Sequence, residues 1–223
     1  MPIGNRILPM PARPDKALIS EFAQMVTPHI SDSMGRLYGA GPSMQAMYNG
    51  QTLAGPAFTV KVTPGDNLLV HWAIDTAQPG DVIVVDAGGI CENAIIGEQM
   101  SSRAEQRGVA GMIIWGAIRD SAELGESSFP VFASGVSHRG PYKEGPGEIN
   151  VPIVIGDMVV MPGDIIVGDA DGIVAVPQSH AKEILDSAKS ILVKETKNLK
   201  EIKAGTVNRD WVVKGLRDKG YTV

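Results

Sequence analysis

Arg119 and Asp120 are adjacent charged residues that follow an apolar segment, residues 111–115. An arginine offers a planar set of donors for a carboxylate or an enolate oxygen, and an aspartate offers the hard oxygen ligand that Mg²⁺ and Mn²⁺ prefer. An Arg-Asp pair on a protein surface is usually only solvated. The apolar segment is typical of a buried strand, however, and ligands of open α/β sheets bind where strands end. The sequence therefore predicts that the pair lies in a binding cleft.

A Gly-rich segment, residues 86–89, follows the apolar run at residues 82–85 and is predicted to face the same cleft. Between the two strands, residues 94–107 have small and apolar side chains at the spacing of an amphipathic helix. This helix either runs unbroken from Ala94 or begins near Gly97. In the second case, the free N–H groups after Gly97 would bind a substrate carboxylate. In the first case, the glycine would only allow close packing of the helix on a strand.

Apolar runs separated by turn residues predict an α/β protein made of short elements. The tripeptide Pro-Gly-Asp at residues 79–81 and 162–164 is interpreted as two strands entered independently through turns, and not as an internal duplication. We expect one domain, residues 1–223, with a helical N-terminal cap (residues 1–40) and C-terminal helices (residues 179–223). The predicted strands are residues 53–62, 82–85, 111–115, 130–133, 151–155, 165–167 and 173–176. The predicted helices are residues 15–25, 31–37, 67–77, 94–107 and 179–203.

Composition excludes several classes of function. The 20 Lys and Arg residues against 25 Asp and Glu residues give a net charge of -5, which provides no attraction to nucleic acid or to an anionic membrane. No run approaches the ~20 apolar residues of a membrane span, and residues 1–14 lack the features of a secretion signal. Cys91 is the only cysteine, so an intrachain disulfide and a cysteine-based metal site are excluded. We expect a cytoplasmic protein.

Histidines provide weaker candidates. His71 and Asp75 share a helix face at i, i+4, where the carboxylate would orient the imidazole, join it as a metal pair, or simply contact it at the surface. His138 and Arg139 lie in a loop, residues 135–147, that is predicted to be flexible. This loop either covers the cleft and binds a distal substrate carboxylate or remains a surface loop.

The spacing of the charged residues resembles a known family. Glu98, twenty intervening residues, Arg119-Asp120, two more residues and Glu123 are similar to the acidic-X20-Arg-Asp-X2-acidic signature of class II pyruvate aldolases. These enzymes cleave 4-hydroxy-4-methyl-2-oxoglutarate and 4-carboxy-4-hydroxy-2-oxoadipate, and they share a fold with the regulator of ribonuclease E activity A. The likeness extends over most of the chain and includes residues 65–67, 107–111, 145–150 and 168–173.

The resemblance implies a fold and an assembly. The fold would be α/β, a β/β/α sandwich of the swivelling-domain type with helical N- and C-terminal extensions. The subunits would assemble as a homotrimer or as a pair of trimers, a homohexamer, with active sites at the subunit boundaries.

The resemblance also implies roles for individual residues. Asp120 would be the direct ligand of a divalent metal, Mg²⁺ or Mn²⁺, and Arg119 would bind the pyruvyl group and stabilise its enolate. Glu98, where many relatives have aspartate, would order metal-bound water. Glu195 from a neighbouring subunit would complete this water shell. The substrate carboxylate would be held by the backbone of Gly97, Glu98, Gln99 and Met100.

The implied reaction is a retro-aldol cleavage of a 4-hydroxy-2-oxo acid. The metal would polarise the 2-keto group, and a metal-associated water would take the proton of the 4-hydroxyl. The C3–C4 bond then breaks and leaves a pyruvate enolate beside the metal and Arg119. Decarboxylation of oxaloacetate gives the same enolate and is an expected side activity.

Two other functions are considered. A non-catalytic protein that binds and regulates a ribonuclease would have the same fold, but regulator-type members lack the aspartate after the arginine, which is present here as Asp120. A Schiff-base aldolase would need a desolvated lysine. Lys61 lies on the polar side of its strand and Lys143 lies in a polar loop, so both are predicted to be solvated.

Overall fold

The computed structural model describes residues 2–50 and 52–223. Its main sheet has the strand order β1-β6-β5-β3-β2-β10-β11. The parallel strands at its centre are β2 (Leu53–Val62), β3 (Val82–Asp86), β5 (Gly111–Ile118) and β6 (Val131–Val136). A short strand, β4 (Ala94–Ile96), also runs parallel to β5. The carboxyl ends of these strands therefore meet at one edge of the sheet.

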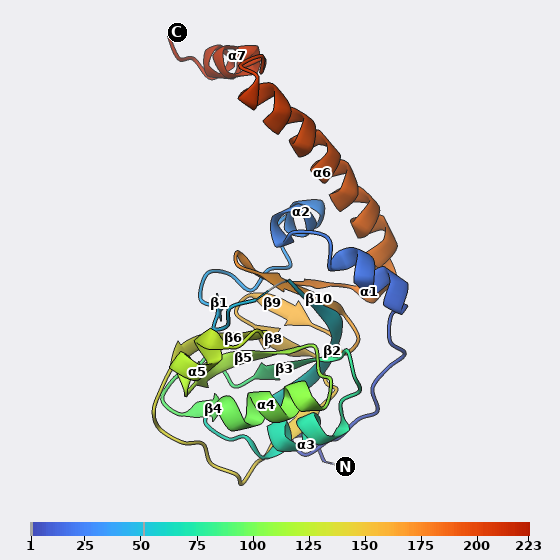
Figure 1. Ribbon diagram of the computed structural model, residues 1–223, viewed down its shortest axis with the longest axis vertical. Helices are drawn as coiled ribbons and strands as arrows, with labels where there is room; N and C mark the ends of the chain where they lie inside the picture. The colour runs from blue at the N-terminus through green and yellow to red at the C-terminus, as the bar shows by residue number, and fades with distance from the viewer. Residues whose placement is uncertain (1, 51) are drawn as a thin grey trace.

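The remaining strands are antiparallel. β10 (Ile165–Asp169) pairs with both β2 and β11 (Gly172–Val176), while β1 (Gln45–Ala46) pairs with β6 and β7 (Gly147–Ile149) with β2. A separate hairpin is formed by β8 (Ile153–Ile155) and β9 (Met158–Val160). In Figure 1, β9 and β10 lie above β3 and β5.

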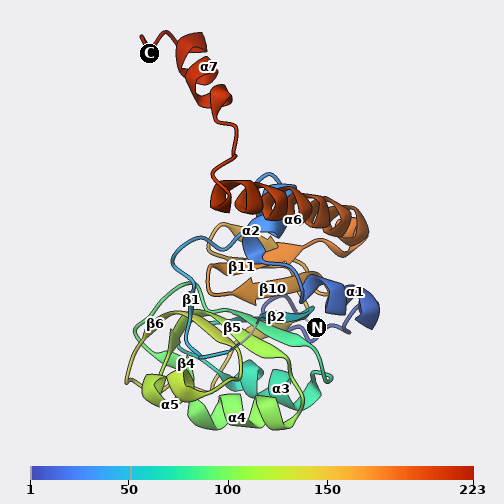
Figure 2. The same ribbon diagram turned by 45° about the horizontal axis from the view of Figure 1, so that its top comes forward.

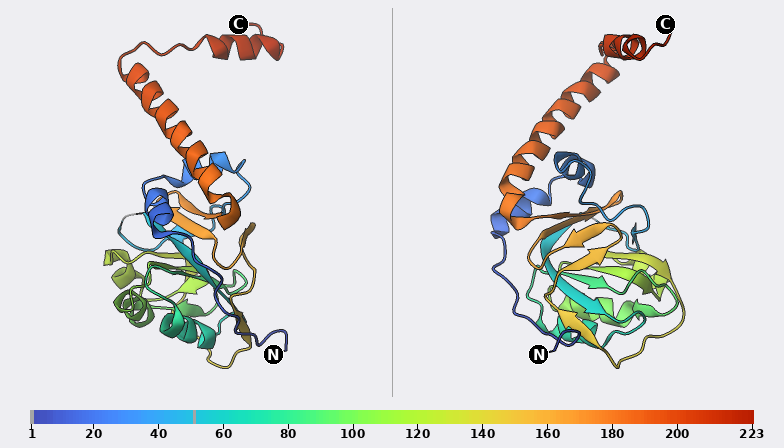
Figure 3. Two further views of the ribbon diagram at one scale, coloured as in Figure 1. Left: turned by 90° about the vertical axis from the view of Figure 1, so that its right-hand side faces the viewer. Right: turned by 180° about the vertical axis from the view of Figure 1, so that it is seen from behind.

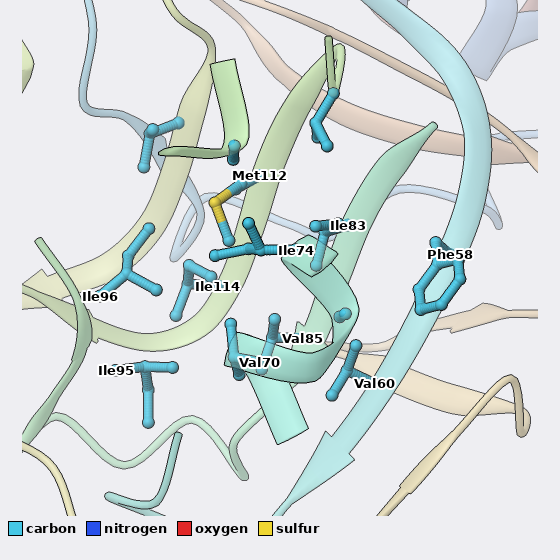
Figure 4. Packing of buried hydrophobic residues seen from close by; sticks show 14 of the residues in the cluster. Phe58, Val60, Val70, Ile74, Ile83, Val85, Ile95, Ile96, Met112 and Ile114 are labelled. Carbon is cyan, nitrogen blue, oxygen red and sulfur yellow. The ribbon is translucent and has the colours of Figure 1, made fainter. Parts of the chain in front are cut away.

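Helices α3 (Leu68–Thr76) and α4 (Glu98–Gln106) cover the lower face of the parallel strands in Figure 1. Figure 4 shows Val70 and Ile74 of α3 packed against Ile83, Val85 and Ile114 of the sheet. Burying apolar side chains stabilises a protein by roughly 25 cal/mol per Å² removed from water, so this layer anchors α3 and α4 firmly. Short α5 (Ser121–Glu126) follows β5.

A second set of helices lies on the other side, over β10 and β11. Helix α1 (Lys16–Phe22) begins at Asp15, whose side chain accepts the N–H of Ala17 as an N-cap. Helix α2 (Thr27–Ser33) and the first turns of α6 (Ala181–Lys203), which follows the 3₁₀ turn η1 (Gln178–His180), pack with α1 on this pair of strands. Figure 2 shows α6 lying across β10 and β11.

The outer part of α6 leaves the body of the protein. Its buried residues are confined to the first turns and end at Ala188. A further helix, α7 (Asp210–Asp218), has no buried residue among those described and lies at the far end of the molecule (Figure 3). The two termini are at opposite ends (Figure 1). None of the helices in residues 2–50 and 52–223 has the length and apolar character needed to cross a bilayer.

The predicted α/β class with helical extensions is confirmed, and β2 has the predicted bounds. The continuous helix over residues 94–107 is wrong, because residues 94–96 form β4, where all three side chains are buried beside β5. The alternative, a helix beginning near Gly97, is confirmed. Met1 lies outside the described residues, as does Gln51. Met1 belongs to the predicted N-terminal cap and to residues 1–14, which lack the features of a secretion signal.

The helix predicted at residues 31–37 is also misplaced. Helix α2 begins earlier, at Thr27, because Pro28 fits the first turn of a helix and Asp169 accepts both the N–H and the hydroxyl of Thr27, each at 2.7 Å. The helix ends at Ser33, before Gly35 and Arg36, which both have positive φ.

Candidate functional site

A cavity of about 140 Å³ opens at the carboxyl-end edge of the sheet. Four segments form its walls: the start of α3, the junction of β4 and α4, the junction of β5 and α5, and the segment of residues 137–146 between β6 and β7, which we call the pocket loop. The lining residues are Asn67, His71, Ile95, Ile96, Gly97, Gln99, Met100, Arg119, Asp120, Pro141 and Lys143.

Asp120 is held in an unusual backbone conformation at the end of β5. Its φ of 56° and ψ of 44° lie in the left-handed region, which residues other than glycine seldom adopt. Strain of this kind persists where the surrounding structure fixes it, and it is common at functional sites. Here Oδ2 of Asp120 accepts the backbone N–H of Glu98 at 3.0 Å, and Nε of Arg119 lies 3.9 Å from the same oxygen.

Glycine is required at position 97 because a side chain would not fit there, and not because of the backbone conformation. Its φ of -153° is extended and open to any residue. A Cβ at this position would lie 2.3 Å from Oδ2 of Asp120 and 2.8 Å from Cγ of Arg119. The absence of a side chain therefore lets both residues approach the first turn of α4, so the alternative role of a helix–strand packing contact does not explain this glycine.

The first turn of α4 presents backbone donors to the cavity. The N–H of Glu98 is used by Asp120, and that of Met100 donates to the carbonyl of Gly97 at 3.1 Å. The N–H of Gln99 has no hydrogen-bond partner among the described residues. Because a helix N-terminus carries partial positive charge, this turn can bind a carboxylate. The side chain of Glu98 is exposed and does not line the cavity.

Asn67 and His71, from the start of α3, form the next wall. Asn67 is 2% exposed, and its Nδ2 donates to the carbonyl of Ile95 at 2.8 Å. Burial lowers the pKa of His71, nearby Lys143 lowers it further, and Asp75 acts in the opposite direction. The imidazole is therefore neutral at pH 7.

Of the alternatives for His71 and Asp75, a hydrogen bond that would orient the imidazole is not found among the described residues. The carboxylate of Asp75 instead accepts Nε and Nη2 of Arg103 at 3.1 and 2.6 Å, and this hydrogen bonding lowers the pKa of Asp75. His71 lines the cavity without it.

The loop predicted to be flexible is held by hydrogen bonds at several points. The carbonyl of Arg139 accepts the N–H of Ala94 at 2.9 Å, and Tyr142 both donates to Gly65 and accepts from Asn67. The loop reaches the cavity through Pro141 and Lys143 and not through the expected His138 and Arg139. Lys143 was predicted to be solvated, and it is exposed, but it also lines the cavity. No local pattern in the sequence shows which residue of a loop faces inward.

The other candidate residues lie outside the cavity. Lys61 forms an ion pair with Asp86, with Nζ 2.7 Å from Oδ2, and Glu123 is exposed on α5. Burial raises the pKa of the Cys91 thiol, which disfavours a reactive thiolate. Glu195 lies on α6 and contacts Nε2 of His29 at 2.7 Å. Helix α6 lies on the other side of the sheet from α3 and α4, whose first turns line the cavity, so Glu195 is not brought to Asp120 within one chain (Figure 1).

Comparisons with known proteins show the family to which the chain belongs. The family model RraA-like, described as Aldolase/RraA, matches residues 27–175. The chain belongs to the RraA-like family. A relative from Halalkalibacterium halodurans, provisionally named 4-hydroxy-4-methyl-2-oxoglutarate aldolase, is 40% identical over 171 residues, which are 77% of this chain and 81% of that protein.

Solved structures of the RraA-like fold superpose on most of the chain. An uncharacterized protein from Pseudomonas syringae has a TM-score of 0.79 at 26% identity and covers 88% of this chain and 96% of its own. The RNA-processing inhibitor RraA from Thermus thermophilus has a TM-score of 0.64 at 29% identity, covering 69% of this chain and 93% of its own. The predicted relation to pyruvate aldolases and to the ribonuclease regulator is thus confirmed at the level of the RraA-like family.

Proposed function

We propose that this protein is a divalent-metal-dependent aldolase that cleaves a 4-hydroxy-2-oxo acid, such as 4-hydroxy-4-methyl-2-oxoglutarate, to pyruvate and a second carbonyl product. One observation carries the proposal: the carboxylate of Asp120 is hydrogen-bonded to the first turn of α4 beside the side chain of Arg119, in a single cavity. A metal ligand, a carboxylate-binding turn and an enolate-binding cation are thereby combined. The names of relatives such as the Halalkalibacterium protein support an aldolase.

The residues present fit Mg²⁺ or Mn²⁺. Mg²⁺ keeps several waters and needs only one or two protein carboxylates, and Asp120 supplies one hard oxygen donor. No cluster of three or more His, Cys, Asp or Glu side chains occurs in the part of the chain that the structure describes. Asp120 would hold the ion, with Glu98 and a neighbouring subunit's Glu195 acting through water. When bound, the ion would supply a Lewis acid for the 2-keto group.

The protein's own groups would bind the substrate and its enolate. The open N–H of Gln99 and the dipole of α4 would hold the C1 carboxylate, which places the 2-keto oxygen near Arg119. A water would take the proton of the 4-hydroxyl as C4 becomes a carbonyl, and the electron pair of the broken C3–C4 bond would form the enolate of pyruvate. The guanidinium of Arg119 would stabilise the negative oxygen, and protonation at C3 would give pyruvate. Loss of CO₂ from oxaloacetate would give the same enolate.

Release of pyruvate from 4-hydroxy-4-methyl-2-oxoglutarate and from 4-carboxy-4-hydroxy-2-oxoadipate tests the proposal. Wild type and Asp120→Ala would be assayed with Mg²⁺ and after EDTA, with oxaloacetate as a further substrate. We expect turnover that needs the metal and is lost in the variant. No turnover of any of the three substrates with Mg²⁺ or Mn²⁺ present would exclude the aldolase.

A regulator of a ribonuclease is the second candidate, because the RNA-processing inhibitor RraA has the same fold. Asp120 argues against this role, because a protein that only binds a ribonuclease has no need of a carboxylate on a strained backbone beside an anion-binding turn. Titration of purified ribonuclease E with the protein, followed by calorimetry, separates the two. Tight binding together with absent turnover would favour the regulator.

Self-association as a trimer or hexamer belongs to the same proposal. The outer part of α6 and helix α7 expose large apolar side chains that the single chain does not cover. They are Leu192, Val193, Leu199, Ile202, Trp211 and Val213. A neighbouring subunit that packs on them would be in a position to receive Glu195.

A further inference from the structure

The same turn occurs three times in the chain, each time as a residue followed by Pro-Gly-Asp. The turns end at Asp66, Asp81 and Asp164, and in each the backbone N–H of the aspartate donates to the carbonyl three residues earlier, at 3.0 to 3.1 Å. All three aspartates are buried. The backbone therefore closes each turn in the same way, and any difference lies in how the carboxylate is used.

Two of the carboxylates stabilise their own turn. Oδ2 of Asp81 accepts the N–H of Gln78 at 2.8 Å, and Oδ2 of Asp164 accepts the N–H of Met161 at 2.9 Å. In both cases the donor is the first residue of the turn. Each bond therefore joins the last residue of the turn to the N–H of its first residue.

Asp66 does not make this local bond. Its Oδ2 accepts two backbone N–H groups of the pocket loop, Glu144 at 2.6 Å and Gly145 at 2.9 Å. Its Oδ1 accepts the N–H of Leu68, the first residue of α3, at 2.9 Å. The N–H of Thr63, which begins the turn, donates instead to Pro146 of the pocket loop at 3.4 Å. The carboxylate of Asp66 and the N–H of Thr63 thus bind the pocket loop and the first residue of α3, and not their own turn.

One carboxylate therefore joins two walls of the cavity. Helix α3 carries His71, and the pocket loop carries Lys143, directly before the two residues that Asp66 binds. On the other side of Lys143, Tyr142 donates to Gly65 at 2.8 Å and accepts from Asn67 at 3.0 Å. The backbone on both sides of Lys143 is fixed, although its side chain is exposed.

The pocket loop adds a positive charge to the cavity, the ammonium group of Lys143. Two cations, Arg119 and Lys143, line the cavity together with the neutral imidazole of His71, against a single carboxylate, Asp120. A substrate held by its C1 carboxylate at α4 would extend its other end toward Lys143. A second negative group at that end would meet a cation whose backbone is already ordered, so binding would have to order only its side chain and not the loop.

We infer that Asp66 is a positioning residue that holds the pocket loop as a preformed wall and thereby places Lys143 to bind a second anionic group, a carboxylate, of the substrate. The inference rests on the proposed function and assigns the part of the substrate that lies beyond the pyruvyl group. Lys143 would contact the substrate and set its specificity, and Asp66 would act through the position of Lys143.

The test compares Asp66→Ala, Lys143→Met and the double variant, with Asp164→Ala as the matched control for loss of a buried turn carboxylate. Pyruvate release from 4-hydroxy-4-methyl-2-oxoglutarate, a dicarboxylate, gives KM and kcat. Exchange of the C3 protons of pyruvate in D₂O, followed by NMR with Mg²⁺ present, reports the pyruvyl end alone. Hydrogen exchange at the amides of Glu144 and Gly145 reports the loop without any turnover.

We expect Asp66→Ala to raise the KM for the dicarboxylate about tenfold, as for loss of one charge-assisted contact, and to change kcat less than twofold. The KM for pyruvate should shift far less. Lys143→Met should raise the same KM, and the double variant should be no worse than the more affected single variant, because the two residues act as a unit. Asp164→Ala should lower thermal stability and leave KM unchanged.

Parallel losses in both reactions, or additive effects in the double variant, would overturn the inference while leaving the aldolase intact. Faster exchange at Glu144 and Gly145 is required in Asp66→Ala, and unchanged protection there would also overturn it. If the wild type releases no pyruvate and exchanges no protons, the proposed function fails. The exchange of the loop amides then still decides whether Asp66 orders the loop.

Discussion

The backbone N–H of Glu98 donates a 3.0 Å hydrogen bond to Oδ2 of Asp120. This bond joins the first residue of α4 to the residue that precedes α5. Because the donor is a backbone group, the bond is independent of the side chain at position 98. It fixes one oxygen of the carboxylate, and the described residues give the other oxygen, Oδ1, no hydrogen-bond partner.

Replacing Asp120 by asparagine should separate structure from chemistry. The amide oxygen can still accept the N–H of Glu98, so the melting temperature without metal should change little, whereas the charge needed by a divalent ion is lost. Pyruvate release should fall by about 10² to 10³, as when one electrostatic group of an active site is removed. Calorimetric titration with Mn²⁺ should show weaker binding in parallel. Normal turnover in the variant would show that Asp120 is not the metal ligand.

Gly97→Ala should displace the carboxylate. The new Cβ would lie 2.3 Å from Oδ2 of Asp120, so either the side chain or the first turn of α4 must move. A displacement near 1 Å at a reacting group can cost about 10²-fold in rate, and kcat should fall by this order. Gly125→Ala, in α5, is the control, since a Cβ there meets nothing within 4 Å. Equal activity of the two variants would contradict the close contact.

His71 should make stability depend on pH. Its pKa is lowered from the ordinary 6.5, so the unfolded chain binds this proton more readily than the folded one. Its contribution is fully present above pH 6.5 and is lost as the pH falls through the lowered value. His71→Gln should therefore flatten the decline of the unfolding free energy below pH 6.5, measured in urea.

The pKa of His71 also tests whether its imidazole lies near Lys143. Removing that positive charge in Lys143→Met should raise the pKa of His71, because Lys143 is one of the groups that lower it. An NMR titration of the imidazole carbon protons gives the midpoint directly. A midpoint that does not move would place the ammonium group away from His71.

Glu195 should act across a subunit boundary. In the single chain its carboxylate contacts His29 and is 55% exposed, so it retains a free side toward a neighbour. Glu195→Ala and Asp120→Ala should each release little pyruvate alone. Subunits of the two variants, unfolded and reassembled together, should regain activity, since some mixed sites receive both intact residues. If the mixtures were as inactive as each variant alone, Glu195 would act only within its own chain.

Local patterns predicted the elements that depend on local interactions. Strand β2 and the N-cap at Asp15 follow from short-range sequence, and the Arg119-Asp120 pair was located by its position after an apolar run. Strand β4 was missed because its small and apolar residues suit either a helix or a buried strand, and only pairing with β5 decides between them.

The walls of the cavity could not be predicted in the same way. The resemblance implied a site role for the backbone of Gln99, but its meeting with Asn67 and Lys143, which are far apart in the sequence, depends on the order of the parallel strands and on the bonds of the pocket loop. The direction of the Asp66 carboxylate was likewise hidden, because its turn has the same Pro-Gly-Asp sequence as two turns whose carboxylates accept an N–H of their own turn. Long-range contacts, and not residue type, distinguish the three.

The outer part of α6 has a consequence for proteolysis. Beyond Ala188 the helix has no buried residue among those described, and it contains several lysines, from Lys194 to Lys203. A helix without tertiary contacts opens readily, so a brief digestion with trypsin should cut there first and leave the remainder as a resistant core. The same cleavage sites become shielded where another subunit packs on this helix, so their rate of cutting should fall as the protein concentration rises.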